Sequence, residues 1–177
     1  ISKRHVGTDP APMSFPEIAR VRQSCRVPAS TDPAGEVARA VLNSRLAERV
    51  KPGGSIALTV GSRGIVGIAS LAIAAVDALK SMGFKPFVVT AMGSHGGGTA
   101  DGQRAMIAEF GITEEFLGCP IKSDMDTVTL GTNSFGLPIA FDKNAFEADG
   151  VILMNRIKPH TSFSGRYESG LLKMLAI

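Results

Sequence analysis

Short apolar segments that alternate with helical patterns constrain the fold of this chain most strongly. Residues 55–60 (SIALTV), 85–90 (KPFVVT) and 151–154 (VILM) are mainly apolar, and a stretch of helical periodicity follows each of them. Strands that are apolar throughout and alternate with helices are typical of a parallel sheet covered on both faces. The sequence therefore predicts an α/β fold with an open, mostly parallel, Rossmann-like sheet and helices on both faces.

The helical segments begin and end with recognisable signals. Asp32-Pro33 supplies an N-cap acid and a proline at the first helical position, and apolar residues then follow helical spacing to Leu46. Lys51-Pro52-Gly53-Gly54 ends this segment. Helices are also expected over residues 68–82 and 101–110, each closed by a glycine, and from Ser169 onward.

Three further segments have other patterns. Residues 1–14 are polar and contain proline, which indicates an arm or loop, and the alternation over residues 18–27 favours an edge strand. The segment 121–141 is rich in Thr, Gly and Asn, and its apolar residues alternate. It predicts a small β-hairpin excursion that turns at Asn133-Ser134-Phe135-Gly136.

Composition excludes several classes of protein. A length of 177 residues fits one α/β domain, expected to span residues 1–177, and 44% hydrophobic residues supply a core. The net charge of +3 is spread along the chain and aromatic content is 6%, so we expect no nucleic-acid partner. The longest apolar stretch, about fifteen residues, is too short for a bilayer, so no membrane partner is expected. Cys25 and Cys119 form neither a disulfide framework nor a zinc site, which favours a cytoplasmic protein.

The residues with chemical potential follow the predicted strands. Gly61-Ser62-Arg63-Gly64 follows the first strand, Gly93-Ser94-His95-Gly96 follows the second, and the segment 155–165 (NRIKPHTSFSG) follows the third. Ligands of open parallel sheets bind beyond the carboxyl ends of the strands. We therefore expect Arg63, His95 and His160 to converge on one crevice.

Each of these residues also has a purely structural interpretation. Arg63 is equally compatible with a solvated surface charge, His95 with a cap for the following helix, His160 with a buried imidazole, and Lys173 with a surface lysine. Familiar motifs give no further guidance, because the chain contains no G-x-S-x-G elbow, dinucleotide fingerprint, P-loop or close histidine spacing for a metal.

Two histidines and an arginine nevertheless permit a specific chemistry. Two imidazoles on opposite sides of one carbon can each exchange a proton near neutral pH, which inversion of a stereocentre requires. A bidentate contact from Arg63 to a carboxylate would fix which atom lies between them. A hydroxyacid racemase fits this set.

The same residues resemble a known family. Gly93-Ser94-His95-Gly96, together with the run from Asn155 through Pro159-His160 and Ser164-Gly165 to Gly170-Leu171-Leu172-Lys173, is similar to the N-terminal domain of the lactate racemase family. These proteins are nickel-dependent 2-hydroxyacid racemases and epimerases. The resemblance covers most of the chain from about Ser55 onward.

The resemblance implies a role for each residue. His95 and His160 would be the acid/base histidines, and Arg63 would bind the carboxylate of a small 2-hydroxyacid. Lys173 would carry a nickel–pincer nucleotide, with Ser62, Lys158, Ser164 and Gly165 as further cofactor-binding residues. One histidine would take the hydroxyl proton while the cofactor accepts hydride from the α-carbon.

The resemblance also implies that part of the machinery lies elsewhere. The nickel-ligating histidine would lie beyond Ile177, so no metal site is expected within these residues. Because the apolar run that ends at Ile177 has no stop signal, we expect an N-terminal part of a longer two-domain isomerase, inactive without its C-terminal domain. Two alternatives stay open: an anion-binding domain of another isomerase or oxidoreductase, and a non-catalytic interaction domain.

Overall fold

The computed structural model describes residues 30–61, 65–156, 164–165 and 170–171. Contacts divide the chain into two compact units, residues 1–30 and residues 31–177, and every element below belongs to the second unit. The strand expected at residues 18–27 and the helix expected from Ser169 onward lie wholly or almost wholly outside the described residues. A single domain over residues 1–177 stays a prediction.

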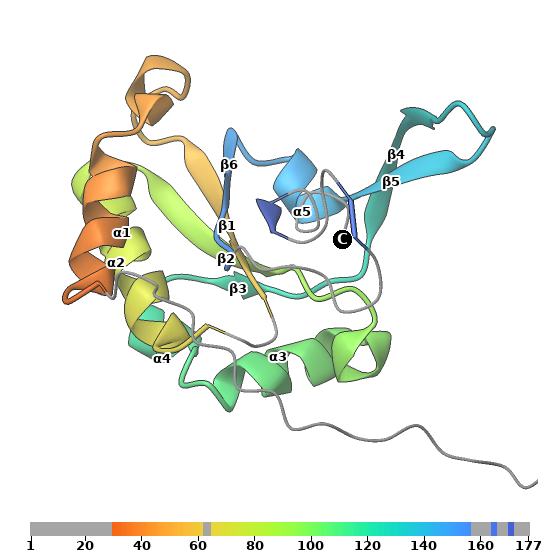
Figure 1. Cartoon of the computed structure of the whole chain (residues 1–177). Helices are drawn as coiled ribbons and strands as arrows, with labels where there is room; N and C mark the ends of the chain where they lie inside the picture. The colour runs from red at the N-terminus through yellow and green to blue at the C-terminus, as the bar shows by residue number, and fades with distance from the viewer. Residues whose placement is uncertain (1–29, 62–64, 157–163, 166–169, 172–177) are drawn as a thin grey trace, which may run out of the picture. The chain divides into compact units, whose positions relative to one another are not determined.

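Four parallel strands form the central sheet (Figure 1). They are β1 (Ser55–Val60), β2 (Lys85–Thr90), β3 (Ile121–Lys122) and β6 (Gly150–Leu153), in the order β3-β2-β1-β6. β1 pairs with β2 over its whole length, from Ser55 opposite Lys85 to Val60 opposite Thr90, and with β6 on its other side. The predicted parallel sheet is confirmed, with the three apolar segments as its longest strands.

The helices of the described part are α1 (Pro33–Leu42), α2 (Ile68–Ser81), α3 (Ala100–Ala108), α4 (Glu114–Leu117) and α5 (Lys143–Phe146), with short 3-10 turns η1 (Arg45–Glu48) and η2 (His95–Gly98). The sequence predicted α1, α2 and α3, whereas the four-residue helices α4 and α5 were not predicted. The side chain of Asp32 accepts a hydrogen bond from the amide of Gly35 at 2.9 Å, which confirms it as the N-cap of α1.

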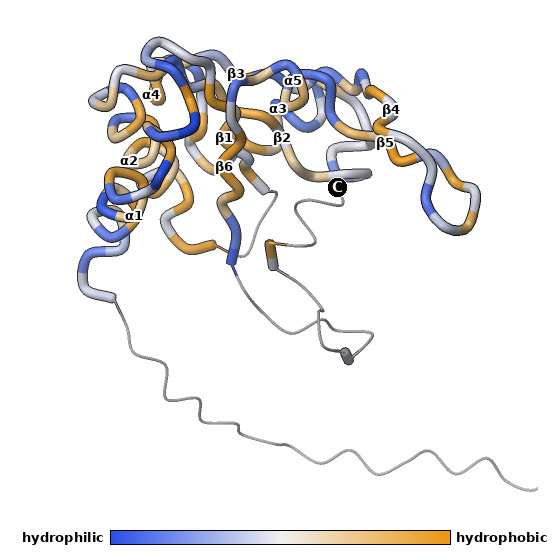
Figure 2. Tube along the Cα trace, turned by 90° about the horizontal axis from the view of Figure 1, so that it is seen from above, coloured by the Kyte–Doolittle hydropathy of each residue, from blue (hydrophilic) through white to orange (hydrophobic). Residues whose placement is uncertain are grey.

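The sheet buries its two faces unequally. Ile56, Leu58 and Val60 point into a core with buried side chains from α1 to α4, whereas Ala57 points to the opposite face. That second face carries a smaller cluster of Ala57, Phe87, Val89 and Ala145, against which Phe141 packs. Helices therefore cover both faces, as expected, but four lie on one side and the four-residue α5 lies on the other. Figure 2 shows hydrophobic residues concentrated along β1, β2 and β6.

The excursion after β3 is the predicted hairpin. β4 (Thr127–Thr132) and β5 (Pro138–Asp142) pair antiparallel and project away from the sheet (Figure 1). The Asn133 side chain accepts hydrogen bonds from the amides of Phe135 and Leu137 at 2.9 and 3.0 Å, which holds the turn.

Two sequence predictions need correction. The helix expected to continue to Leu46 ends at Leu42, because Ser44 has extended backbone (φ −70°, ψ 157°) and Leu46 belongs to η1. Residues 121–122 belong to the parallel sheet as β3 rather than to the hairpin. A two-residue strand has no periodicity to detect.

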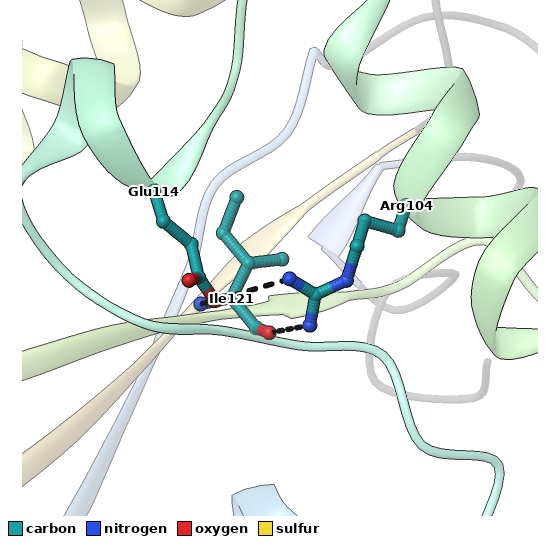
Figure 3. A network of polar contacts seen from close by, with 3 residues as sticks. All are labelled: Arg104, Glu114 and Ile121. Carbon is teal, nitrogen blue, oxygen red and sulfur yellow. Dashed lines mark hydrogen bonds and ion pairs between the residues drawn. The ribbon is translucent and has the colours of Figure 1, made fainter.

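Polar side chains from α3 and α4 hold this short strand in place (Figure 3). Glu114 accepts from the amide of Ile121 at 2.8 Å and pairs with Arg104 at 3.1 Å, and Arg104 also donates to the Ile121 carbonyl. The hydrogen bond from the Ile121 amide, and then that from the Arg104 guanidinium, holds the pKa of Glu114 below its ordinary value. Side chains from α3 and α4 thus form hydrogen bonds with both the amide and the carbonyl of Ile121.

No helix within the described ranges is both long and apolar enough to cross a membrane.

Replacing Leu58 by alanine should lower the free energy of unfolding by about 2–5 kcal/mol, because its side chain is fully buried at the centre of the larger core. Leu130→Ala is the matched control, since Leu130 lies on the hairpin with 51% of its surface exposed, and should change stability by about 0.5 kcal/mol or less. Urea unfolding measures both. Equal losses would contradict the assignment of the core.

Replacing Glu114 by glutamine should destabilise the protein at pH 7 and have less effect in acid. A carboxylate whose pKa is lowered by folding stabilises the native state above its ordinary pKa of 4.5, and that contribution is lost as the pH falls through the lower folded value. The unfolding midpoints of native protein and Glu114→Gln should therefore converge as the pH drops below 4.5. Glu115→Gln, an exposed neighbour, should leave the midpoint nearly unchanged at either pH.

Candidate functional site

The topology of the sheet marks a place for a ligand between β1 and β6. From β1 the chain moves through β2 to β3 on one side and later returns to β6 on the other side. Where the direction of winding changes, the loops after two adjacent strands separate and leave a crevice at the carboxyl edge. The amide of Met154 donates to the buried Thr59 side chain at 3.1 Å, so β1 and β6 are joined up to this point.

Two small cavities lie side by side at this edge on the second face of the sheet. One, of about 70 Å³, is lined by the strand residues Thr59, Thr90 and Leu153 and is bounded by Phe141 of β5. The other, of about 200 Å³, shares Thr90 and Phe141 and extends to Gly93 of the loop after β2. We call the two cavities together the rim crevice.

The predicted site residues that follow β1 and β6 lie outside the described residues. Ser62 and Arg63 come directly after Gly61, and Lys158 and His160 come shortly after Arg156. Lys173 lies outside them as well. The convergence of Arg63 and His160 with His95 thus stays a prediction.

Ser164 and Gly165 are described, and both are exposed. Their exposure leaves them accessible to a ligand. Their position relative to the other predicted cofactor-binding residues stays a prediction.

His95 lies in η2, two residues after Gly93, which lines the rim crevice. Glycines with positive φ surround it: Gly93 at +57°, Gly96 at +63° and Gly97 at +71°. A Cβ on Gly96 would lie 2.5 Å from the backbone nitrogen of Gln103, so this glycine lets the loop rest directly on the first turn of α3. The loop is therefore shaped by close backbone contact and not by side-chain packing alone.

The side chain of His95 is partly buried. Its Nδ1 atom is buried and has no hydrogen-bond partner among the residues that the structure describes. The interpretation of His95 as a helix cap is wrong, because Thr99 caps α3 by accepting from the amide of Gly102 at 3.1 Å. A buried ring nitrogen without a partner is costly, so we expect Nδ1 to form a hydrogen bond with a group other than the described residues.

Sequence reasoning did not identify the acidic residues of the rim crevice. Asp142 and Asp124 line it, and burial raises the pKa of Asp142 above its ordinary value, with a smaller contribution from Asp124. Asp142 also caps α5 by accepting from the amide of Ala145 at 2.7 Å, and Asn144 donates to Asp124 at 2.9 Å. These hydrogen bonds give the carboxylates a structural role, and the described ranges contain no group of three ligands suited to a metal.

A larger groove lies elsewhere in the described part. It has a volume of about 600 Å³, lies between α1 and β6, and is lined mainly by apolar side chains such as Val37, Val41 and Leu171. No acid/base group converges on it within the described ranges, so its size does not make it the better candidate.

Comparison with known proteins identifies a family. The model of the lactate racemase N-terminal domain matches residues 8–170. No curated protein matches the chain at a significant level, and no solved structure does.

Replacing Gly96 by alanine should distort the His95 loop, whereas the same change at Gly97 should be milder. Both glycines have positive φ, which costs about 1–2 kcal/mol for alanine, but nothing lies within 4 Å of a Cβ at Gly97. The additional clash with the first turn of α3 should make Gly96→Ala the less stable variant in urea unfolding. Equal stabilities would show that the loop does not rest on α3.

Proposed function

The chain belongs to the lactate racemase N-terminal domain family, and from this premise we propose that it is the catalytic and cofactor-binding domain of a 2-hydroxyacid racemase or epimerase. The observation that carries the proposal is the His95 loop, which follows β2 at the carboxyl edge of the sheet and leaves a buried imidazole nitrogen unpaired within the described residues. An imidazole exchanges protons near neutral pH, and an unpaired nitrogen is available for that exchange.

The proposed reaction inverts the carbon that bears the hydroxyl group. His95 and His160 act from opposite sides of that carbon: one removes the hydroxyl proton of one enantiomer, and the other donates a proton to the oxygen as the opposite enantiomer forms. Inversion also requires that the bond between the α-carbon and its hydrogen breaks and re-forms, which needs a hydride acceptor. Arg63 holds the carboxylate through two parallel hydrogen bonds, which fixes the α-carbon between the imidazoles. β1 and β6 support this assignment, because Arg63 and His160 follow the two strands that flank the change in winding direction.

The chemistry of these residues fits a nickel–pincer nucleotide. Lys173 is proposed to carry it, with Ser62, Lys158, Ser164 and Gly165 as its other contacts. Ser164 and Gly165 are exposed and therefore accessible to a large polar group. When bound, the group supplies the hydride acceptor that the side chains of this chain lack.

The proposal includes a second domain and a cytoplasmic location. A C-terminal domain would supply the nickel-ligating histidine and the other wall of the substrate site. The small 2-hydroxyacid is thus proposed to bind between two domains, a common place for ligand sites.

The proposal is tested with full-length protein coexpressed with the enzymes that synthesise the cofactor. Incubation with single enantiomers of short 2-hydroxyacids should give the opposite enantiomer, and mass spectrometry of the intact protein should locate the added mass on Lys173. An unmodified Lys173 would remove the cofactor attachment from the proposal, and no interconversion of any 2-hydroxyacid would remove the racemase.

Replacing His95 or His160 by alanine should lower turnover by about 10²–10⁴-fold, the usual contribution of a positioned acid or base. His5→Ala is the control, because His5 lies before the matched residues 8–170 and should leave turnover unchanged. Circular dichroism checks that each variant folds. Full activity in His95→Ala or His160→Ala would contradict the assigned role.

A further inference from the structure

Gln103 is a buried amide that the proposed chemistry does not use. It lies on α3, only 2% of its surface is exposed, and it is one of three buried polar side chains among the described residues. A buried carboxamide is costly unless both of its ends are hydrogen-bonded. We therefore expect both ends of the Gln103 amide to have hydrogen-bond partners.

Both ends of the amide have partners on the segment that leads to His95. The Thr90 hydroxyl donates to Gln103 Oε1 at 2.5 Å, and Gln103 Nε2 donates to the Gly93 carbonyl at 2.8 Å. Thr90 is the last residue of β2, and Gly93 lies two residues before His95. One side chain thus ties the end of the strand and the start of the loop to the same helix.

A second contact fixes the loop on the other side of His95. Gly96 rests against the backbone of Gly102 and Gln103, and a Cβ on Gly102 would lie 1.9 Å from the Gly96 carbonyl oxygen. The Thr99 hydroxyl donates to that same carbonyl at 3.1 Å. His95 is therefore held between two attachments to the first turn of α3, and Gln103 is the side chain that makes the earlier one.

We propose that Gln103 is a positioning residue, which sets the place of the His95 imidazole through Thr90 and Gly93. The inference rests on the proposed function, in which His95 exchanges a proton with the substrate. An acid or base misplaced by about 1 Å can lose about 10²-fold in rate, so an amide that fixes the loop has a direct effect on turnover.

The first test measures the loop itself and needs no activity. Gln103→Met keeps the approximate shape and removes both hydrogen bonds, so amide hydrogen exchange at residues 93–98 should become at least tenfold faster while that of β1 stays unchanged. The ring resonance of His95, identified with a His95→Asn variant among only three histidines, should shift or broaden. Unchanged exchange at residues 93–98 would overturn the proposal.

A matched pair at Thr90 gives the same test with a smaller change. Thr90→Val removes the hydroxyl that Gln103 accepts from, and Thr90→Ser retains it. Thr90→Val should reproduce the loosened loop and Thr90→Ser should not. This pair decides the question even if Gln103→Met fails to fold, and equal behaviour of the two variants would count against the proposal.

Kinetics of the full-length, cofactor-loaded protein then separate positioning from direct binding. Gln103→Met should lower kcat by about 10²-fold with little change in KM. A raised KM with unchanged kcat would instead make Gln103 a substrate contact and overturn the positioning role. If native protein shows no racemisation, the proposed function fails, while the exchange and resonance measurements still decide whether Gln103 holds His95.

Discussion

The described sheet is arranged around β1, whose residues from Ile56 to Val60 are buried between β2 and β6. Ile56, Ala57, Leu58 and Val60 have no exposed surface, so the strand has to be covered by neighbours on both edges and by side chains on both faces. Burial of this apolar surface is the largest favourable contribution to folding. Because β1 is central and its neighbours run parallel to it, the carboxyl ends of β2, β1 and β6 lie side by side at one edge of the sheet.

The two faces of the sheet are covered unequally. Helices α1 to α4 pack into one continuous core, whereas α5 and the base of the hairpin leave cavities on the other face. The large core on the first face supports the strands from one side. The cavities on the second face leave room beside Thr59 and Thr90. Loops carried by such a scaffold commonly hold functional residues.

Much of the fold was predictable because it depends on local patterns. The strands at 55–60, 85–90 and 151–154, the Asp32 cap and the turn at Asn133 all follow from hydrophobic periodicity and from side chains that bond to nearby backbone. β3 was not predictable, because its two residues are fixed by Glu114 and Arg104, which come from α4 and α3. Among the candidate site residues, His95 was singled out by its place after a strand, and its role stays a proposal. Gln103 gave no signal, since its bonds to Thr90 and Gly93 exist only once α3 packs beside β2.

The sequence by itself determined the fold class, the places of the three longest sheet strands and of helices α1 to α3, and the family to which the chain belongs, because periodicity, caps and motifs are properties of neighbouring residues. The tertiary structure decided the order of strands in the sheet and the unequal cover of its faces. It also decided that Thr99, and not His95, caps α3 and that the His95 loop rests on Gly102 and Gln103. These features depend on contacts between segments far apart in the chain, or on a choice among competing local bonds that packing settles, and no local pattern encodes them.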